Sequence, residues 1–322
     1  MGGVHGRARA VCLLAVALPL AGTLGGCASG LSRLRDVELP PRARVEGVPV
    51  LVQTEDHCGP TSLASLLAWA GHPETPEALA PLVYLPGRSG TLPIDLPREV
   101  RARGLLAYRV RPHFEALLAE AGAGHPVLLL ENRGLGWLPR WHYSVLTGYD
   151  LSEGIAVLHA GGPAPEGVAL GRLRRTWERG GAFGLLALPP GRLPAGDDRE
   201  GILESLADLE EGGHALQAGA GYEAFARRWA GDWRGTFGLG NARYAVGDLP
   251  GAEDAFRRSH AVGSGRPEPL NNLALLLAQA GRAGEARVLA ERAVGNARLL
   301  GMDPSPYQHT LRTLEPGGGG PR

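Results

Sequence analysis

Hydrophobic and polar positions divide the chain into a mixed N-terminal part and a helical C-terminal part. Apolar residues dominate two short stretches, Val48–Gln53 and Pro126–Leu130, which is the pattern of buried strands. From Gly59 onward, the sequence GPTSLASLLAWAG spaces its apolar side chains for one face of a helix, which Gly71 ends. From Ile202 onward, Ala, Leu, Glu and Arg dominate and favour helices. We predict an α+β domain, a linker and an all-α domain, over residues 47–194, 195–201 and 202–314.

The first 27 residues have the pattern of an export signal. Arg7 and Arg9 precede an apolar stretch that is too short and too Gly-broken for a comfortable membrane span. It ends in LGGC, which resembles the lipobox of bacterial lipoproteins. The resemblance implies that Cys27 is acylated and anchors the chain in the cell envelope, at an outer membrane facing the periplasm if the host has two membranes. The alternative is a plain signal peptide with an incidental Cys. Residues 28–46 then form a tether, and residues 315–322 a disordered tail.

Composition removes several function classes. The formal net charge is zero, which gives no electrostatic case for binding nucleic acid. All 33 basic residues are Arg, so mechanisms that need a lysine are excluded. We find no HExxH, no CxxC, no pair of carboxylates at a spacing useful for a metal site and no phosphate loop, and we therefore expect no metal and no cofactor.

Cysteine usage singles out Cys58. Cys12 would be lost with the signal, and Cys27 would carry lipid on its sulfur, so Cys58 is the one free thiol of the mature chain. A lone Cys is often a small core residue. Cys58, however, follows a polar segment and stands at the start of the expected helix, where unpaired N–H groups favour a thiolate. This position is typical of a nucleophile.

Two further residues complete a candidate site. His142 opens the strand HYSVLTGYD, about 84 residues after Cys58, and is a credible base for the thiol, although a structural His is equally compatible with that position. Gln53 lies five residues before Cys58. Its amide and the backbone N–H of Cys58 would form an oxyanion hole, whereas in isolation it could equally be an ordinary polar strand end.

Together these motifs resemble the C39 family of papain-like, bacteriocin-processing cysteine peptidases. The similar motifs are Gln53, then CGP from Cys58, the PVLLL strand and HY-x-V-x-x-GYD from His142, over about residues 46–190. The resemblance implies a papain-like fold in which Cys58 is the nucleophile, His142 the general base and Gln53 the oxyanion donor. The expected reaction is peptide hydrolysis through a thioester.

One piece of the family pattern is missing. The family orients its His with an Asp or Asn at the end of the next strand, here IAVLHAGG, where His159 and Ala160 stand. Asp150 ends the His strand itself and is expected to shape a turn. We expect a backbone carbonyl or His159 to hold the ring of His142.

The C-terminal part repeats at a period of 34 residues. Gly240, Gly247 and Ala252 recur as Ala274, Gly281 and Ala286. Residues 233–266 and 267–300 therefore align as two helix-turn-helix units that resemble tetratricopeptide repeats, and residues 202–230 look like a worn third unit. A generic helical bundle is the alternative. Such repeats imply a surface that binds a protein or peptide.

The sequence thus predicts a lipid-anchored cysteine peptidase, a papain-like domain followed by an all-α tetratricopeptide-type domain that docks a protein partner or substrate. The alternative is a catalytically degenerate C39-like lipoprotein that binds peptides and acts as a scaffold through its repeats.

Overall fold

The computed structural model describes residues 2, 39–53, 57–88 and 90–314. The predicted signal peptide apart from Gly2, the acylation site Cys27, residues 28–38 of the tether and the predicted tail all lie outside the described residues. The chain divides into two compact units, residues 1–37 and 38–322, and everything below concerns the second.

The first part of this unit mixes strands and helices, as expected. In chain order the elements are β1 (Arg42–Arg44), α1 (Cys58–Trp69), α2 (Pro76–Val83), β2 (Tyr84–Leu85), the 3-10 helix η2 (Pro86–Arg88), β3 (Gly90–Thr91), α3 (Asp95–Arg101), β4 (Leu106–Arg109), α4 (Phe114–Gly122), β5 (Val127–Asn132), β6 (Trp141–Asp150), β7 (Ile155–His159), β8 (Glu166–Ala169), α5 (Leu170–Arg179) and β9 (Gly184–Leu188).

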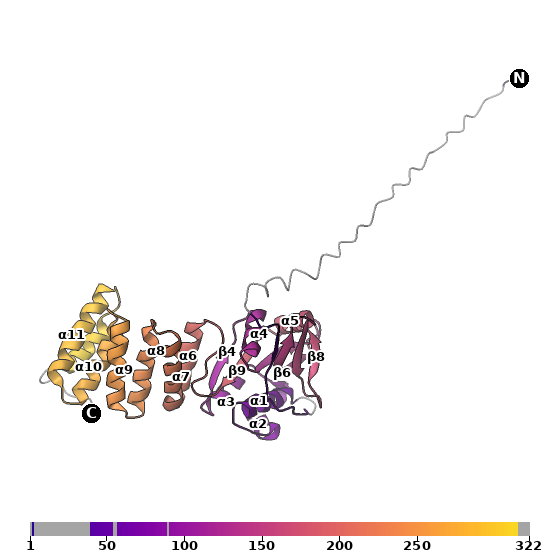
Figure 1. Cartoon of the computed structure of the whole chain (residues 1–322), viewed down its shortest axis with the longest axis horizontal. Coiled ribbons are helices and arrows are strands. Elements are labelled where there is room, and N and C mark those ends of the chain that lie inside the picture. The colour runs from indigo at the N-terminus through magenta and orange to yellow at the C-terminus, as the bar shows by residue number, and fades with distance from the viewer. Residues whose placement is uncertain (1, 3–38, 54–56, 89, 315–322) are drawn as a thin grey trace. The chain divides into compact units, whose positions relative to one another are not determined.

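One antiparallel sheet of seven strands organises this part (Figure 1). Its order is β4-β9-β5-β6-β7-β8, and β1 pairs with the far end of β6. The long strand β6 is central because it pairs with β5 through its first half and with β7 through its second half. A separate pair, β2 and β3, forms a small ribbon.

Helices cover both faces of the sheet. On β5 the side chains of Leu128 and Leu130 belong to a buried apolar cluster with Leu63 and Leu67 of α1. Successive strand residues point to opposite faces, and Glu131 accordingly contacts Thr176 of α5. Helix α1 therefore packs on one face and α5 on the other, and the start of β6 lies between them.

The prediction of a strand at Val48–Gln53 was wrong. The segment is irregular and pairs with no strand. Pro49 has no N–H to give to a ladder, and the segment is held instead by single contacts, such as the hydrogen bond from Gln53 N–H to the Gly161 carbonyl at 3.0 Å. It thereby runs past the end of β7 toward Cys58.

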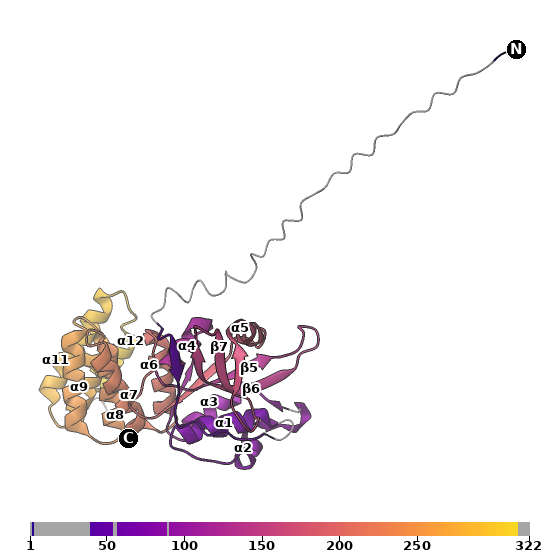
Figure 2. The same ribbon diagram turned by 45° about the vertical axis from the view of Figure 1, so that its right-hand side comes forward.

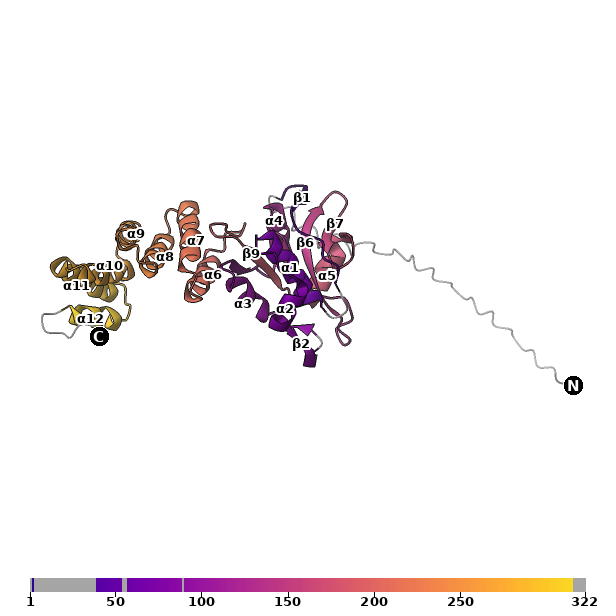
Figure 3. The same cartoon turned by 90° about the horizontal axis from the view of Figure 1, so that it is seen from below.

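The C-terminal region is entirely helical, with seven helices among the described residues (Figures 2 and 3). They are α6 (Arg199–Glu211), α7 (Ala215–Arg228), α8 (Trp233–Ala245), α9 (Leu249–Val262), α10 (Pro267–Gln279), α11 (Ala283–Leu299) and α12 (Ser305–Thr313).

The 34-residue period corresponds to helix pairs. Residues 233–266 contain α8 and α9, and residues 267–300 contain α10 and α11. Small residues permit the close approach within a pair: a Cβ added to Gly240 would lie 2.5 Å from the ring of Phe256. Among the described residues no helix is both long enough and apolar enough to span a bilayer.

Candidate active site

Cys58 is the first residue of α1, one position earlier than the helix start expected from the sequence. The preceding residue, His57, makes no side-chain cap, and the first turn holds no acidic residue. The free N–H groups of a helix start carry partial positive charge. The half-buried thiol of Cys58, which forms no disulfide within the described ranges, therefore lies where a negative charge is stabilised.

Gly59 allows the ribbon strand β3 to reach this helix start. A Cβ on Gly59 would lie 2.3 Å from Thr91 Oγ1 and 2.6 Å from Thr91 Cβ, closer than side chains pack. The Thr91 carbonyl in turn accepts a hydrogen bond from the hydroxyl of Tyr143 at 3.1 Å. Burial and then the nearby Cys58 raise the pKa of Tyr143, so the phenol stays protonated. Together these contacts tie β3, α1 and β6 into one wall.

Gln53 is positioned by a glycine of the turn after β7. Besides the backbone hydrogen bond between them, the two residues are in close contact: a Cβ on Gly161 would lie 2.2 Å from Gln53 Cδ. Gly161 also has a φ of +87°, a backbone conformation that L side chains rarely adopt. The sequence could have signalled this contact only through the Gly-Gly pair that follows β7.

His142 is the second residue of β6 and is mostly buried. Its pKa is lowered from 6.5 to about 4, first by burial and then by Arg133, while Glu131 and a hydrogen bond with the Ala160 backbone act in the opposite direction. The imidazole is therefore neutral at pH 7 and able to accept a proton. Its Nε2 atom is enclosed and has no partner in good hydrogen-bond geometry among the described residues.

These three side chains, which the sequence singled out separately, line one cavity of about 660 Å³. Thr91, Leu130, Trp141, Tyr143 and Gly180 are among the other residues around it. Three polar atoms here are buried without a partner among the described residues, namely Gln53 Oε1, Thr91 Oγ1 and His142 Nε2. Buried polar groups are normally hydrogen-bonded, so such a cluster is typical of a site that awaits a polar ligand.

The described contacts include no hydrogen bond between Cys58 and His142. Catalytic hydrogen bonds are often long before substrate binds, and the shared cavity places both residues at one site.

The side of His142 toward β7 carries no carboxylate. His159 does not hold the ring: its own imidazole bonds with the Pro49 backbone, and burial lowers its pKa. The Ala160 backbone acts on His142 instead, which is one of the two expected substitutes. Asp150 lies at the other end of β6 and accepts hydrogen bonds from Ser152 and Arg42, so it shapes a turn.

Sequence reasoning missed Glu131, which lies directly opposite His142 in the β5–β6 pairing. It is 2% exposed, and three side chains contact its carboxylate: Ser144, Thr176 and Arg133. The available signal was a charged residue in the otherwise apolar stretch PVLLLEN.

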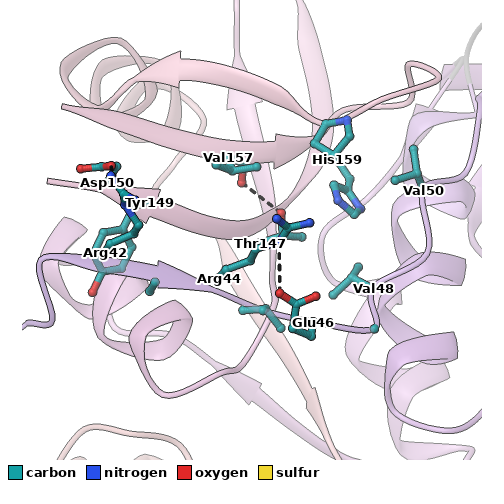
Figure 4. Close-up of a pocket in the computed structure, with 14 residues that line it drawn as sticks. Arg42, Arg44, Glu46, Val48, Val50, Thr147, Tyr149, Asp150, Val157 and His159 are labelled. Atoms are coloured by element: carbon teal, nitrogen blue, oxygen red, sulfur yellow. Dashed lines mark hydrogen bonds and ion pairs between the residues drawn. The ribbon is translucent and has the colours of Figure 1, made fainter. Parts of the chain in front are cut away.

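A second cavity, of about 420 Å³, lies between β1 and the end of β7 (Figure 4). Its charged residues are paired, Arg42 with Asp150 and Arg44 with Glu46, and His159 borders it. Among the described residues it is lined by no thiol, and the hydroxyl of Thr147 is engaged with the Val157 carbonyl, so the cavity at Cys58 is the better candidate. In the described ranges no group of three or more His, Cys, Asp or Glu residues is arranged to hold a metal ion.

Comparison with known proteins gives distant structural similarities only. No family model and no curated protein matches the chain. A double-glycine-motif protease from an AMS/PCAT transporter, solved with its leader peptide, is 23% identical, with 45% of this chain and 92% of that chain covered and a TM-score of 0.36. The type III secretion translocator chaperone SycD of Yersinia enterocolitica is 19% identical, with 37% and 92% covered and a TM-score of 0.33. SycD in complex with a peptide of the translocator YopD is likewise 19% identical, with 37% of this chain and 93% of that chain covered and a TM-score of 0.33.

Proposed function

We propose that this protein is a C39-like cysteine peptidase that hydrolyses peptide bonds through Cys58 and His142. The observation that carries the proposal is the convergence of Cys58, His142 and Gln53 on one cavity, where three buried polar atoms have no partner within the part of the chain that the structure describes. The position of Cys58 at the start of α1, where the N-cap residue His57 makes no side-chain cap, also favours a thiolate.

The reaction follows from these positions. His142 takes the proton of the Cys58 thiol, and the thiolate attacks the substrate carbonyl carbon. The amide of Gln53 and the N–H of Cys58, which has no acceptor within the helix, stabilise the oxyanion. His142 then protonates the leaving amine, and a thioester remains. Water, activated by His142, hydrolyses the thioester and restores the thiol.

A second candidate is a degenerate module that binds peptides without cutting them. It is favoured by the lack of a hydrogen bond between Cys58 and His142 and by the absence of a carboxylate at Ala160. Incubation of the chain with a complex peptide library separates the two functions. Hydrolysis predicts new peptide termini with the wild type and none with Cys58→Ala. Peptide retention by both proteins without new termini would establish the binding module.

We assign the helical region a docking role, as a tetratricopeptide-like array. It carries a cavity of about 590 Å³ lined by aromatic side chains (Tyr222, Trp233 and Phe237) and by several Glu residues. Aromatic side chains beside charged groups suit a peptide segment. With a cleaved substrate in hand, Phe237→Ala is expected to raise KM and leave kcat unchanged; a fall in kcat alone would exclude docking.

The proposed location is the bacterial cell envelope, at an outer membrane facing the periplasm, with Cys27 acylated. This rests on the sequence pattern before Cys27. Metabolic labelling with palmitate should mark the wild type and not Cys27→Ser, which should also leave the membrane fraction. Equal labelling of both proteins would exclude the anchor.

A further inference from the structure

His142 has a strand neighbour on one side and a loop residue on the other. The pairing of β6 with β7 begins at Val145, and the backbone of Ala160, which follows β7, forms a hydrogen bond with His142. On the β5 side Glu131 is its direct cross-strand partner. Directly opposite residues of an antiparallel pair place their side chains on the same face, with Cβ atoms about 4.5–5.5 Å apart. A carboxylate is therefore adjacent to the candidate base, but on the strand opposite to the one expected.

Three side chains hold the carboxylate of Glu131 in place. Ser144 donates to Oε2 at 2.9 Å, Thr176 lies 2.8 Å from Oε1, and Arg133 donates to Oε2 at 3.1 Å. Hydroxyl and guanidinium donors of this kind stabilise an ion inside a protein. None of these contacts uses His142, so the carboxylate is held in place independently of the imidazole.

We propose that Glu131 is a positioning residue of the site, whose buried carboxylate stabilises the positive charge that His142 acquires when Cys58 gives up its proton. This inference rests on the proposed function. In the step concerned, the S–H bond of Cys58 breaks, an N–H bond forms on His142, and no other bond changes. Glu131 keeps its charge and its three contacts throughout, and it acts through space across the β5–β6 pair.

The other charged groups around His142 leave Glu131 as the only source of negative charge apart from the thiolate itself, within the part of the chain that the structure describes. Arg133, after β5, opposes it and lowers the pKa of His142. From α1, Cys58 lines the same cavity as His142. From α5 comes Arg179, which donates to the Asn132 carbonyl at 3.1 Å. From β7, His159 is engaged with the Pro49 backbone.

Glu131 and Arg133 carry opposite charges, so removing one or the other should change the reactivity of Cys58 in opposite directions, and this gives a sharp test. The rate of Cys58 alkylation by iodoacetamide is measured on the full chain at pH 6 and at pH 9.5. At pH 6 an ordinary thiol is protonated, so labelling depends on transfer of the proton to His142. Glu131→Gln keeps the shape and removes the charge, and it should slow labelling at pH 6 by about 3- to 30-fold. Arg133→Met should accelerate it by a similar factor.

At pH 9.5 an ordinary thiol is largely ionised without help, so all variants should then label alike. Glu120→Gln is the matched control, because Glu120 is 3% exposed and is bound to His125, away from His142. It should not change the rate at pH 6. If Glu131 had a purely structural role, the isosteric Glu131→Gln variant would either label at the wild-type rate at pH 6 or change the labelling rate equally at both pH values.

The labelling rates distinguish a failure of this inference from a failure of the proposed function. If His142→Ala labels like the wild type at pH 6, the Cys58–His142 pair is not formed and the proposed function is wrong. If His142→Ala is slow while Glu131→Gln matches the wild type, the pair works without Glu131 and the inference is overturned, whatever the rate of Arg133→Met. Should Glu131→Gln fail to fold, the rate of Arg133→Met decides by its sign.

Discussion

A methyl group on Gly161 should disable the oxyanion hole and leave the nucleophile intact. The added Cβ would lie 2.2 Å from Gln53 Cδ and 2.4 Å from Oε1. Carbon atoms in contact are about 3.5–4.0 Å apart, so in Gly161→Ala the Gln53 side chain must move by more than about 1 Å. An oxyanion donor displaced by that distance no longer reaches the intermediate, and losing one such donor costs about 10²- to 10³-fold in rate.

Two reactions of Cys58 separate this effect from a general loss of reactivity. Acylation by p-nitrophenyl acetate passes through an oxyanion, and we expect Gly161→Ala to slow it about 100-fold. Alkylation by iodoacetamide has no oxyanion, so its rate should match the wild type.

The control variant is Gly124→Ala. Gly124 has a φ of +82° and nothing within 4 Å of an added Cβ, so it shares the backbone strain without the collision. Both variants should lose about 1–2 kcal/mol of stability, but only Gly161→Ala should lose acylation. Wild-type acylation by folded Gly161→Ala, or an equal loss in Gly124→Ala, would refute the role given to Gln53.

Three further predictions concern the wall of the site, pH and the helical region. Gly59→Ala should displace Thr91 and destabilise the chain by about 1–3 kcal/mol in urea unfolding; an unchanged midpoint would contradict the close packing. Since burial holds the pKa of His142 near 4, below its ordinary 6.5, the folded state resists protonation. The contribution of His142 to the free energy of unfolding is therefore complete above pH 6.5 and declines as the pH falls toward 4. Between pH 7 and 4.5 the free energy of unfolding of His142→Gln should fall by about 2–3 kcal/mol less than that of the wild type, and equal falls would contradict this. The side chain of Phe256 is 2% exposed, so Phe256→Ala leaves a cavity and should lower the free energy of unfolding, followed by circular dichroism, by about 3–5 kcal/mol. The rate of Cys58 alkylation should stay unchanged.

The sequence contained the local signals for much of the fold. Periodic apolar residues located α1 to within one residue, and the buried run PVLLL and the His142 segment correspond to β5 and β6. The repeat of 34 residues predicted the helix pairs α8–α9 and α10–α11. These features depend on neighbours in the chain, which is why hydropathy and turn residues were sufficient.

Features that depend on distant partners were not readable. Val48–Gln53 has the composition of a strand, but no strand lies beside it, so it is irregular. The need for Gly at position 161 arises from contact with Gln53, more than a hundred residues away. Glu131 acquires its significance from the register that sets it opposite His142, and one charged residue in an apolar run does not specify that register.

The central claim, that Cys58 and His142 form a reactive pair, is tested most directly by the pH dependence of Cys58 alkylation. The wild type and His142→Ala are treated with iodoacetamide between pH 5 and 10, and the peptide containing Cys58 is followed by mass spectrometry. The account predicts that the wild type labels rapidly below pH 7 and that His142→Ala labels rapidly only at alkaline pH. A single rise near pH 8.5, the value of an ordinary thiol, in both proteins would contradict it.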